Sequence, residues 1–192
     1  FGVADPILGR DVSFYIFTLP VLDFLRYTGL GLVVLSFIGS IGGYVATGQI
    51  AFSPKGLSVG PKSRQHLSML IAAIFVFLAA GAYLDIPRTL TTPSGIVHGV
   101  SYADQAVRLP ALYILTIVAA VGALAAAYGA LSSTIWPVAA AVAGYFVVSV
   151  ISGGAASLLQ QFVVTPDEQS KEAPFLTHNI AATRIAFGLD NI

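Results

Sequence analysis

A short polar stretch between two apolar segments contains side chains of the types that hydrolases use. Two serines, a histidine and an aspartate stand close together there: Ser94, His98, Ser101 and Asp104. A serine becomes a nucleophile only with an ordered base within hydrogen-bond reach, and neither serine has the Gly-x-Ser-x-Gly surroundings of a nucleophile elbow. We therefore expect no catalytic residue here, and a surface hydrolase is the weakest of three functional hypotheses.

Metal and cofactor chemistry has few candidate ligands in this sequence. The three histidines are His66, His98 and His178, and none lies inside an apolar segment, where the axial ligand of a membrane haem would stand. No metalloprotease or paired-ligand spacing is present. The chain has no cysteine, which excludes disulfides, thiolate metal sites and cysteine nucleophiles. We therefore expect no metal site and no cofactor, and we assign no cofactor-binding residue.

Three arginines near the ends of apolar segments could bind lipid phosphates, because a guanidinium matches the geometry of phosphate oxygens. These are Arg88, Arg108 and Arg184. An acidic residue close to each one in the sequence offers a structural alternative, which is an ion pair within the chain. The candidate partners, in the same order, are Asp85, Asp104 and Asp190. We favour the ion pairs.

The class of protein follows from one long apolar stretch. Residues 109–166 contain no Asp, Glu, Lys or Arg. One helix of that length would be about 87 Å long, whereas about 20 apolar residues cross a bilayer, so we expect two crossings joined by a turn. Only 9% of all residues are charged, compared with about 25% in soluble domains. The chain is therefore predicted to be an integral membrane protein.

Four segments are long and apolar enough to span a membrane, which predicts an all-α fold. They are residues 20–45, 67–84, 110–131 and 136–159, with a polar hinge at residues 131–134 between the last two. Residues 1–19 form a lead-in and residues 160–192 a tail.

Prolines and a charged pair help to place the ends of these spans. Pro20 and Pro137 suit the first turn of a helix, and the second span is expected to stop before Pro87. Asp23 and Arg26 are expected to pair one turn apart at the membrane surface, just before the first apolar core.

The polar segments outside the spans are expected to lie on the membrane surface, partly as short amphipathic helices. The link between spans two and three has a turn at residues 91–95 and a short helix near residues 102–108. In the tail, a capping box at residues 165–168 starts one helix. A second helix at residues 175–187 should lie flat, because Arg184 would otherwise be stranded inside the bilayer.

Charge indicates which side each loop faces. With four spans, both chain ends lie on one side and the loop at residues 46–66 lies on the other. That loop contains Lys55, Lys62 and Arg64 without an acidic residue, whereas every Asp and Glu falls on the side of the termini. The raw count of Lys and Arg favours the reverse orientation, but we give more weight to the unopposed cations. The termini are therefore expected to be extracytoplasmic.

Several stretches of the sequence carry a family resemblance: DVSFYIFTLP at residues 11–20, SYAD at 101–104 with RLPAL at 108–112, and KEAP and NIAATR within 163–189. They resemble, in order, segments of a large uncharacterised family of multi-pass bacterial membrane proteins of the UPF type. The resemblance implies a location in a bacterial inner (cytoplasmic) membrane and about seven spans, of which this chain is the later part. It also implies a large extracytoplasmic domain after the tail. Phe1 in place of an initiator Met also indicates a fragment. The family has no established activity to transfer.

The leading functional hypothesis is a non-enzymatic structural or accessory subunit that packs in a larger membrane complex. Gly39 and Gly43 form a small-xxx-small pair, which lets another helix approach closely. The alternative is a transporter or lipid-handling protein whose polar site lies in parts of the chain not present. The expected partners are membrane lipids and other transmembrane helices, and no nucleic acid, because the net charge is zero.

Overall fold

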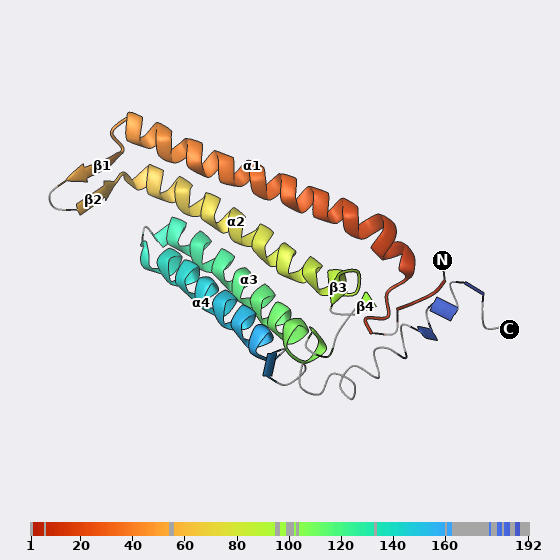
Figure 1. The fold of residues 1–192 in the computed structure, drawn as a ribbon. Helices are drawn as coiled ribbons and strands as arrows, with labels where there is room; N and C mark the ends of the chain where they lie inside the picture. The colour runs from red at the N-terminus through yellow and green to blue at the C-terminus, as the bar shows by residue number, and fades with distance from the viewer. Residues whose placement is uncertain are drawn as a thin grey trace. The chain divides into compact units, whose positions relative to one another are not determined.

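The fold consists mainly of four long helices (Figure 1). The computed structural model describes residues 2–5, 7–53, 56–94, 97–98, 102, 104–132, 134–159, 161–162, 177, 180–181, 183–184 and 187–188. The helices are α1 (Leu19–Ala46), α2 (Pro61–Arg88), α3 (Leu109–Ser132) and α4 (Trp136–Leu159). Each belongs to a helical stretch long and apolar enough to cross a membrane, so the predicted all-α class with four spans is confirmed.

Proline marks the start of each long helix. Pro61 is the first residue of α2, whereas the prolines of α1, α3 and α4 are each second: Pro20, Pro110 and Pro137. At the starts of α2 and α4 the first N–H groups have no intrahelical partner, so Pro61 and Pro137 remove no hydrogen bond and their fixed φ favours the helix. Pro20 and Pro110 follow π-helical turns that lead into α1 and α3. The predicted bounds of α1, α3 and α4 are confirmed to within about one residue.

Helix α2 is longer than predicted at both ends. It begins at Pro61, whereas the predicted span began at residue 67. The residues in between are helical, but they are too polar to count as part of a span. It also continues through Pro87 to Arg88, so the prediction that it stops before this proline is wrong. A proline in the last turn removes only one N–H donor, and the Thr89 N–H still reaches the Asp85 carbonyl oxygen at 3.2 Å.

A π-helical turn, η1 (Phe14–Thr18), leads directly into α1. The stretch that is long and apolar enough to span a membrane therefore runs over Phe14–Ala46 and includes Asp23 and Arg26. The sequence placed these two residues just before the apolar core. In the structure they lie inside one continuous helix that begins at Phe14.

A β-hairpin connects α1 and α2. Its strands, β1 (Ile50–Ser53) and β2 (Gly56–Val59), pair antiparallel with Ile50 opposite Val59. The sequence analysis treated this region as a loop. Each strand has only 4 residues, which is too short for an alternating pattern to stand out.

A second, shorter hairpin and a π-helical turn connect α2 and α3. Strands β3 (Pro93–Ser94) and β4 (Val97–His98) pair antiparallel at the position of the predicted turn. The turn η2 (Asp104–Arg108) matches the predicted short helix. The first predicted tail helix, which starts at residues 165–168, lies outside the described residues. Within the second, predicted at residues 175–187, the described residues 177, 180, 181, 183 and 184 are helical.

The chain forms two compact units. One consists of Phe1–Leu22, Tyr83–Tyr113 and Val150–Ile192, and the other of Asp23–Ala82 and Ile114–Ser149. The first unit collects the lead-in, the link between α2 and α3, and the tail. These are the three polar segments that a four-span topology places on one side of a membrane, so the grouping agrees with that topology.

Within the second unit, the other helices pack against α2. Phe75 of α2 is 3% exposed, and a Cβ added at Gly122 of α3 would lie 2.8 Å from its ring. The Phe75 ring also meets the Tyr145 ring of α4 edge-on, with centroids 5.8 Å apart. The Phe77 ring lies against Gly29 of α1 in the same way. Glycines thus let aromatic rings reach the backbone of neighbouring helices, which is how apolar spans pack closely.

Candidate functional site

Two of the three candidate arginines lie in ion pairs. Arg88 Nη1 is 3.0 Å from Asp85 Oδ1. Arg108 Nη1 is 3.3 Å from Asp104 Oδ1. The predicted pairing is confirmed for both, and an arginine that already contacts a carboxylate is a weaker candidate for a lipid phosphate. The predicted partner of Arg184 lies outside the described residues.

The two ion pairs differ in burial. The side chain of Asp104 is 8% exposed, whereas that of Asp85 is 31% exposed. A buried carboxylate depends more strongly on its cationic partner, because it has lost its hydration. The pair of Asp104 and Arg108 is therefore the stronger determinant of local structure, at the turn that leads into α3.

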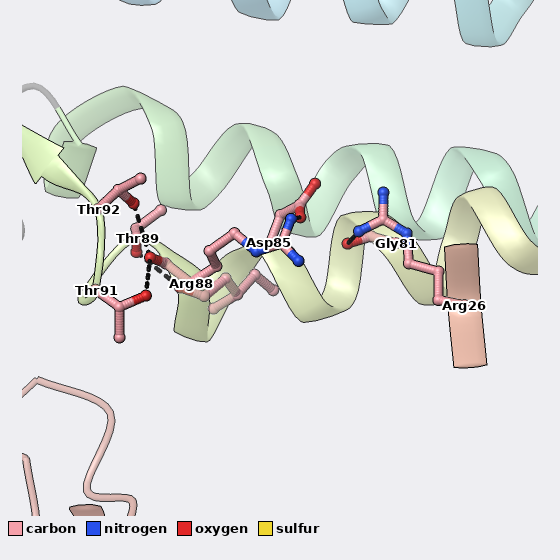
Figure 2. Close-up of polar contacts among 8 residues, drawn as sticks. Arg26, Gly81, Asp85, Arg88, Thr89, Thr91 and Thr92 are labelled. Carbon is pink, nitrogen blue, oxygen red and sulfur yellow. Dashed lines mark hydrogen bonds and ion pairs between the residues drawn. The ribbon is translucent and has the colours of Figure 1, made fainter. Parts of the chain in front are cut away.

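Threonine hydroxyls close the C-terminal end of α2 (Figure 2). The Arg88 carbonyl oxygen accepts hydrogen bonds from the hydroxyls of Thr91 and Thr92, at 3.0 and 2.7 Å. The hydroxyl of Thr89, a residue that is 1% exposed, donates to the Ile86 carbonyl oxygen at 2.7 Å. These bonds satisfy carbonyl groups that a helix end leaves without intrahelical partners, so the threonines have a structural role.

The lead-in before α1 is a loop built around Asp5. Its carboxylate accepts the Tyr15 hydroxyl at 2.6 Å. It also accepts backbone N–H groups, those of Ile7, Leu8 and Arg10, at 2.9, 2.6 and 2.9 Å. Partial burial raises the pKa of Asp5, but these hydrogen bonds outweigh burial and hold the pKa below its usual value of 3.8. The loop is thus organised by a charged carboxylate.

Arg10 fastens this loop to α2. Its Nη2 donates to the Tyr83 hydroxyl at 3.0 Å. Its guanidinium also lies 4.5 Å from the centroid of the Phe14 ring, where a cation is attracted by the ring quadrupole. These contacts give Arg10 a packing role.

Arg26 of α1 reaches the apolar part of α2. Its Nη1 lies 3.5 Å from the Gly81 carbonyl oxygen, and its guanidinium lies 4.7 Å from the centroid of the Tyr27 ring. Figure 2 shows the guanidinium beside Gly81, where an added Cβ would lie 2.6 Å from it. Ionisable residues within spans are candidates for function. The contacts of Arg26 fit the attachment of one helix to another.

The candidate ligands and hydrolase residues are not assembled into a site within the described part of the chain. His66 Nδ1 lies 2.9 Å from the Tyr44 hydroxyl oxygen, which links α1 to α2. The other histidines and both serines have no described side chain: His98, His178, Ser94 and Ser101. Asp104, the remaining member of the hydrolase group, is paired with Arg108. Among the described residues, no three His, Cys, Asp or Glu side chains form a group that could hold a metal ion.

One face of α1 has no neighbour among the described residues. The partly buried positions of this helix recur every three or four residues, at Gly29, Val33, Phe37, Ser40 and Tyr44. Outside this row of positions, nothing lies within 4 Å of a Cβ built at Gly39, Gly42 or Gly43. Leu32 and Leu35, also outside the row, are 61% and 67% exposed. We call these five residues, Leu32, Leu35, Gly39, Gly42 and Gly43, the open α1 face.

Comparisons with known proteins find one family. The chain matches the group described as "Uncharacterised protein family (UPF0182)" over residues 1–192. UPF0182 proteins of Pelobacter propionicus, Geobacter sulfurreducens and Frankia alni are 37%, 35% and 34% identical to it, each over 100% of this chain. The chain covers only 22%, 22% and 19% of their lengths, so it spans about a fifth of the curated relatives that it matches. No solved structure matches the chain.

Proposed function

Since the chain belongs to the uncharacterised protein family UPF0182, which supplies no activity, we propose a function from its surfaces. The proposal is that these four spans are a non-enzymatic packing platform, against which other transmembrane helices of a larger membrane protein or complex dock. The open α1 face is the observation that supports it.

Glycine content distinguishes this face from an ordinary lipid-facing surface. Lipid tails are as apolar as leucine, so exposed leucines alone do not favour helix association over lipid contact. Glycines four residues apart, as at Gly39 and Gly43, let a second helix backbone approach closely and gain van der Waals contact. No residue in the most apolar stretch of α1 is buried, compared with 33% in α2. The face therefore suits a helix supplied by the rest of a longer protein or by another subunit.

The polar groups support a structural rather than a catalytic role. Arg88 and Arg108 pair with neighbouring aspartates, and Asp5 organises the lead-in loop. Arg10 fastens that loop to α2. Each of these groups has a contact that explains its presence without a substrate.

We further propose that the termini of this chain face the extracytoplasmic side of a bacterial inner membrane. The unopposed cations of residues 46–66 support this orientation. Because the chain contains no cysteine, Lys62→Cys provides a single labelling site in this region. It should react with an impermeant thiol reagent only after the cells are opened. Labelling in intact cells would reverse the orientation.

The packing proposal is tested by crowding the open α1 face in the full-length protein. Gly39→Ile combined with Gly43→Ile should block close approach of a second helix. Gly144→Ile is the matched control, because nothing lies within 4 Å of a Cβ at Gly144 either. Gly144 lies on α4, away from the open α1 face.

The two possible origins of the docking helix give different readouts in mild detergent. If it belongs to another subunit, a stoichiometric partner should co-purify with the wild type and the control but not with the double variant. If it belongs to the same polypeptide, the double variant should melt at a lower temperature than the control. A protein that purifies alone, binds a small ligand and tolerates both changes equally would favour the transporter or lipid-handling alternative.

A further inference from the structure

The end of α2 that carries the β1–β2 hairpin is strongly positive. Lys62 and Arg64 lie in the first turn of α2, where Lys62 is exposed and Arg64 is half-buried. Lys55 precedes β2 in the sequence but lies outside the described residues. No Asp or Glu occurs between Asp23 and Asp85, so these cations have no acidic neighbour along the chain.

Folding does not supply the missing negative charge within this compact unit. The unit consists of Asp23–Ala82 and Ile114–Ser149, and Asp23 is its sole acidic residue. Tyr44 contacts His66 near the start of α2, and Asp23 lies about 30 Å before Tyr44 along α1, at about 1.5 Å per residue. Physiological salt screens charges beyond about 8 Å. The positive end of the α2 dipole adds repulsion of the same sign, so the cations attract an anion from outside the unit.

The hairpin is fixed at its base beside these cations. The Gly60 N–H donates to the Gln49 carbonyl oxygen at 2.8 Å. The Ser63 hydroxyl also bonds to the Gln49 side-chain oxygen. Ser63 and Ile50 are 0% and 8% exposed. The base of the hairpin is therefore closed against the first turn of α2, and the cations are presented on a preformed surface.

An exposed apolar side chain stands on the strand that leads into this turn. Leu57 on β2 is 59% exposed. The hairpin joins the ends of two helices of membrane length, which is where a bilayer's phosphate layer meets its hydrocarbon. Basic residues near a membrane surface attract anionic head groups, and an exposed leucine beside the head groups can bury itself at their boundary with the acyl chains. A soluble acidic partner would give the leucine no comparable environment.

From the exposed leucine and the unopposed cations at this end of α2 we infer that Leu57 of β2 and Lys62 and Arg64 of α2, which we call the basic patch, bind the head groups of anionic phospholipids. Lys62 and Arg64 contact the phosphate oxygens, and Leu57 contacts the first carbons of the acyl chains. The inference is independent of the packing proposal, because it concerns a different surface. It also holds for either orientation of the chain, because the probe lipid is offered to the purified protein.

The test uses the full-length protein in mild detergent and short-chain phosphatidylglycerol, with phosphatidylcholine of the same chain length as the neutral comparison. Binding is followed by native mass spectrometry. Phosphatidylglycerol should bind more tightly than phosphatidylcholine. Lys62→Gln combined with Arg64→Gln should weaken phosphatidylglycerol binding roughly 10- to 30-fold. The charge-preserving variant, Lys62→Arg with Arg64→Lys, should retain most of it.

A second variant separates loss of binding from loss of folding. Leu57→Ser keeps both cations, and it should weaken binding of phosphatidylglycerol without changing the melting temperature in phosphatidylcholine. Equal binding of the two lipids by the wild type would overturn the inference, as would unchanged phosphatidylglycerol binding by the Gln double variant. Complete displacement of the lipid by millimolar inorganic phosphate would show that the surface takes phosphate rather than lipid, and would overturn it too.

Discussion

Arg26 on α1 packs against Gly81 on α2. Because glycine has no side chain, Gly81 leaves room for the Arg26 guanidinium, and we call the two residues a matched pair. Arg26 Nη1 lies 3.5 Å from the Gly81 carbonyl oxygen. Gly81 falls inside the apolar segment predicted at residues 67–84, so the guanidinium contacts α2 within its apolar part. A charged group in apolar surroundings is stable only when those surroundings provide acceptors, and the bare backbone of a glycine exposes a carbonyl oxygen for that purpose.

Filling the space at Gly81 should loosen α1 from α2. A Cβ there would lie 2.6 Å from the Arg26 guanidinium, which is the end of a flexible side chain, so Gly81→Ala should be mild. Gly81→Leu should displace the guanidinium and cost about 1–3 kcal/mol of unfolding free energy, measured by SDS titration of the full-length protein. Gly31→Leu is the control, because the space around Gly31 is open. Equal effects of the two leucines would contradict the matched pair.

Crowding Gly122 should be more damaging, because the group that it contacts cannot move away. A Cβ at Gly122 would lie 2.8 Å from the Phe75 ring, and Phe75 is only 3% exposed. We expect Gly122→Ala to cost about 1–3 kcal/mol. Gly144→Ala on α4 has nothing within 4 Å and should be neutral or stabilising by up to about 1 kcal/mol, because alanine favours the helix. Thermal melting in detergent distinguishes the two, and a Gly122→Ala variant as stable as Gly144→Ala would show that Phe75 moves freely.

Local signals in the sequence account for what could be predicted. The bounds of α3 and α4 follow from an uninterrupted apolar run and from Pro110 and Pro137. The ion pair between Asp85 and Arg88 has the i,i+3 spacing of neighbours on one helix face. In these cases the residues that decide the structure lie within one or two turns of each other.

Contacts between distant segments explain what could not be predicted. Nothing near Gly81 in the sequence indicates that Arg26 lies against it, because the two are brought together only when α1 packs on α2. The same holds for Gly122 and Phe75. The β1–β2 hairpin did carry one overlooked signal, which is Gly56 at its turn with a φ of +115°, a conformation that favours glycine.

Acid should loosen the lead-in loop. Hydrogen bonds hold the pKa of Asp5 below its usual value of 3.8, so the carboxylate's contribution to stability is fully present above pH 3.8. That contribution is lost as the pH falls through the lower, folded-state pKa. Amide hydrogen exchange of the lead-in, corrected for the intrinsic rate at each pH, should therefore accelerate only below about pH 4.

Removing one donor to Asp5 should shift this acid transition upward. Tyr15→Phe deletes the hydroxyl that lies 2.6 Å from the carboxylate, so the folded-state pKa should move back toward 3.8. The lead-in should then begin to exchange at a higher pH than in the wild type. Tyr128→Phe, at a position that is 62% exposed, should leave the transition unchanged. If Tyr15→Phe leaves it unchanged as well, Asp5 does not control the loop.

The two confirmed ion pairs should respond differently to loss of their arginine. Asp104 is 8% exposed on its side chain, so Arg108→Gln leaves a buried carboxylate without its cation and should cost about 1–3 kcal/mol. Asp85 is 31% exposed and water can replace its partner, so Arg88→Gln should cost less than about 1 kcal/mol. Adding Asp104→Asn to Arg108→Gln should recover part of the loss, because the stranded charge is then removed. Unfolding free energies of the three variants and the wild type form the test. An Arg88→Gln loss as large as that of Arg108→Gln would mean that burial of the carboxylate does not set the strength of these pairs.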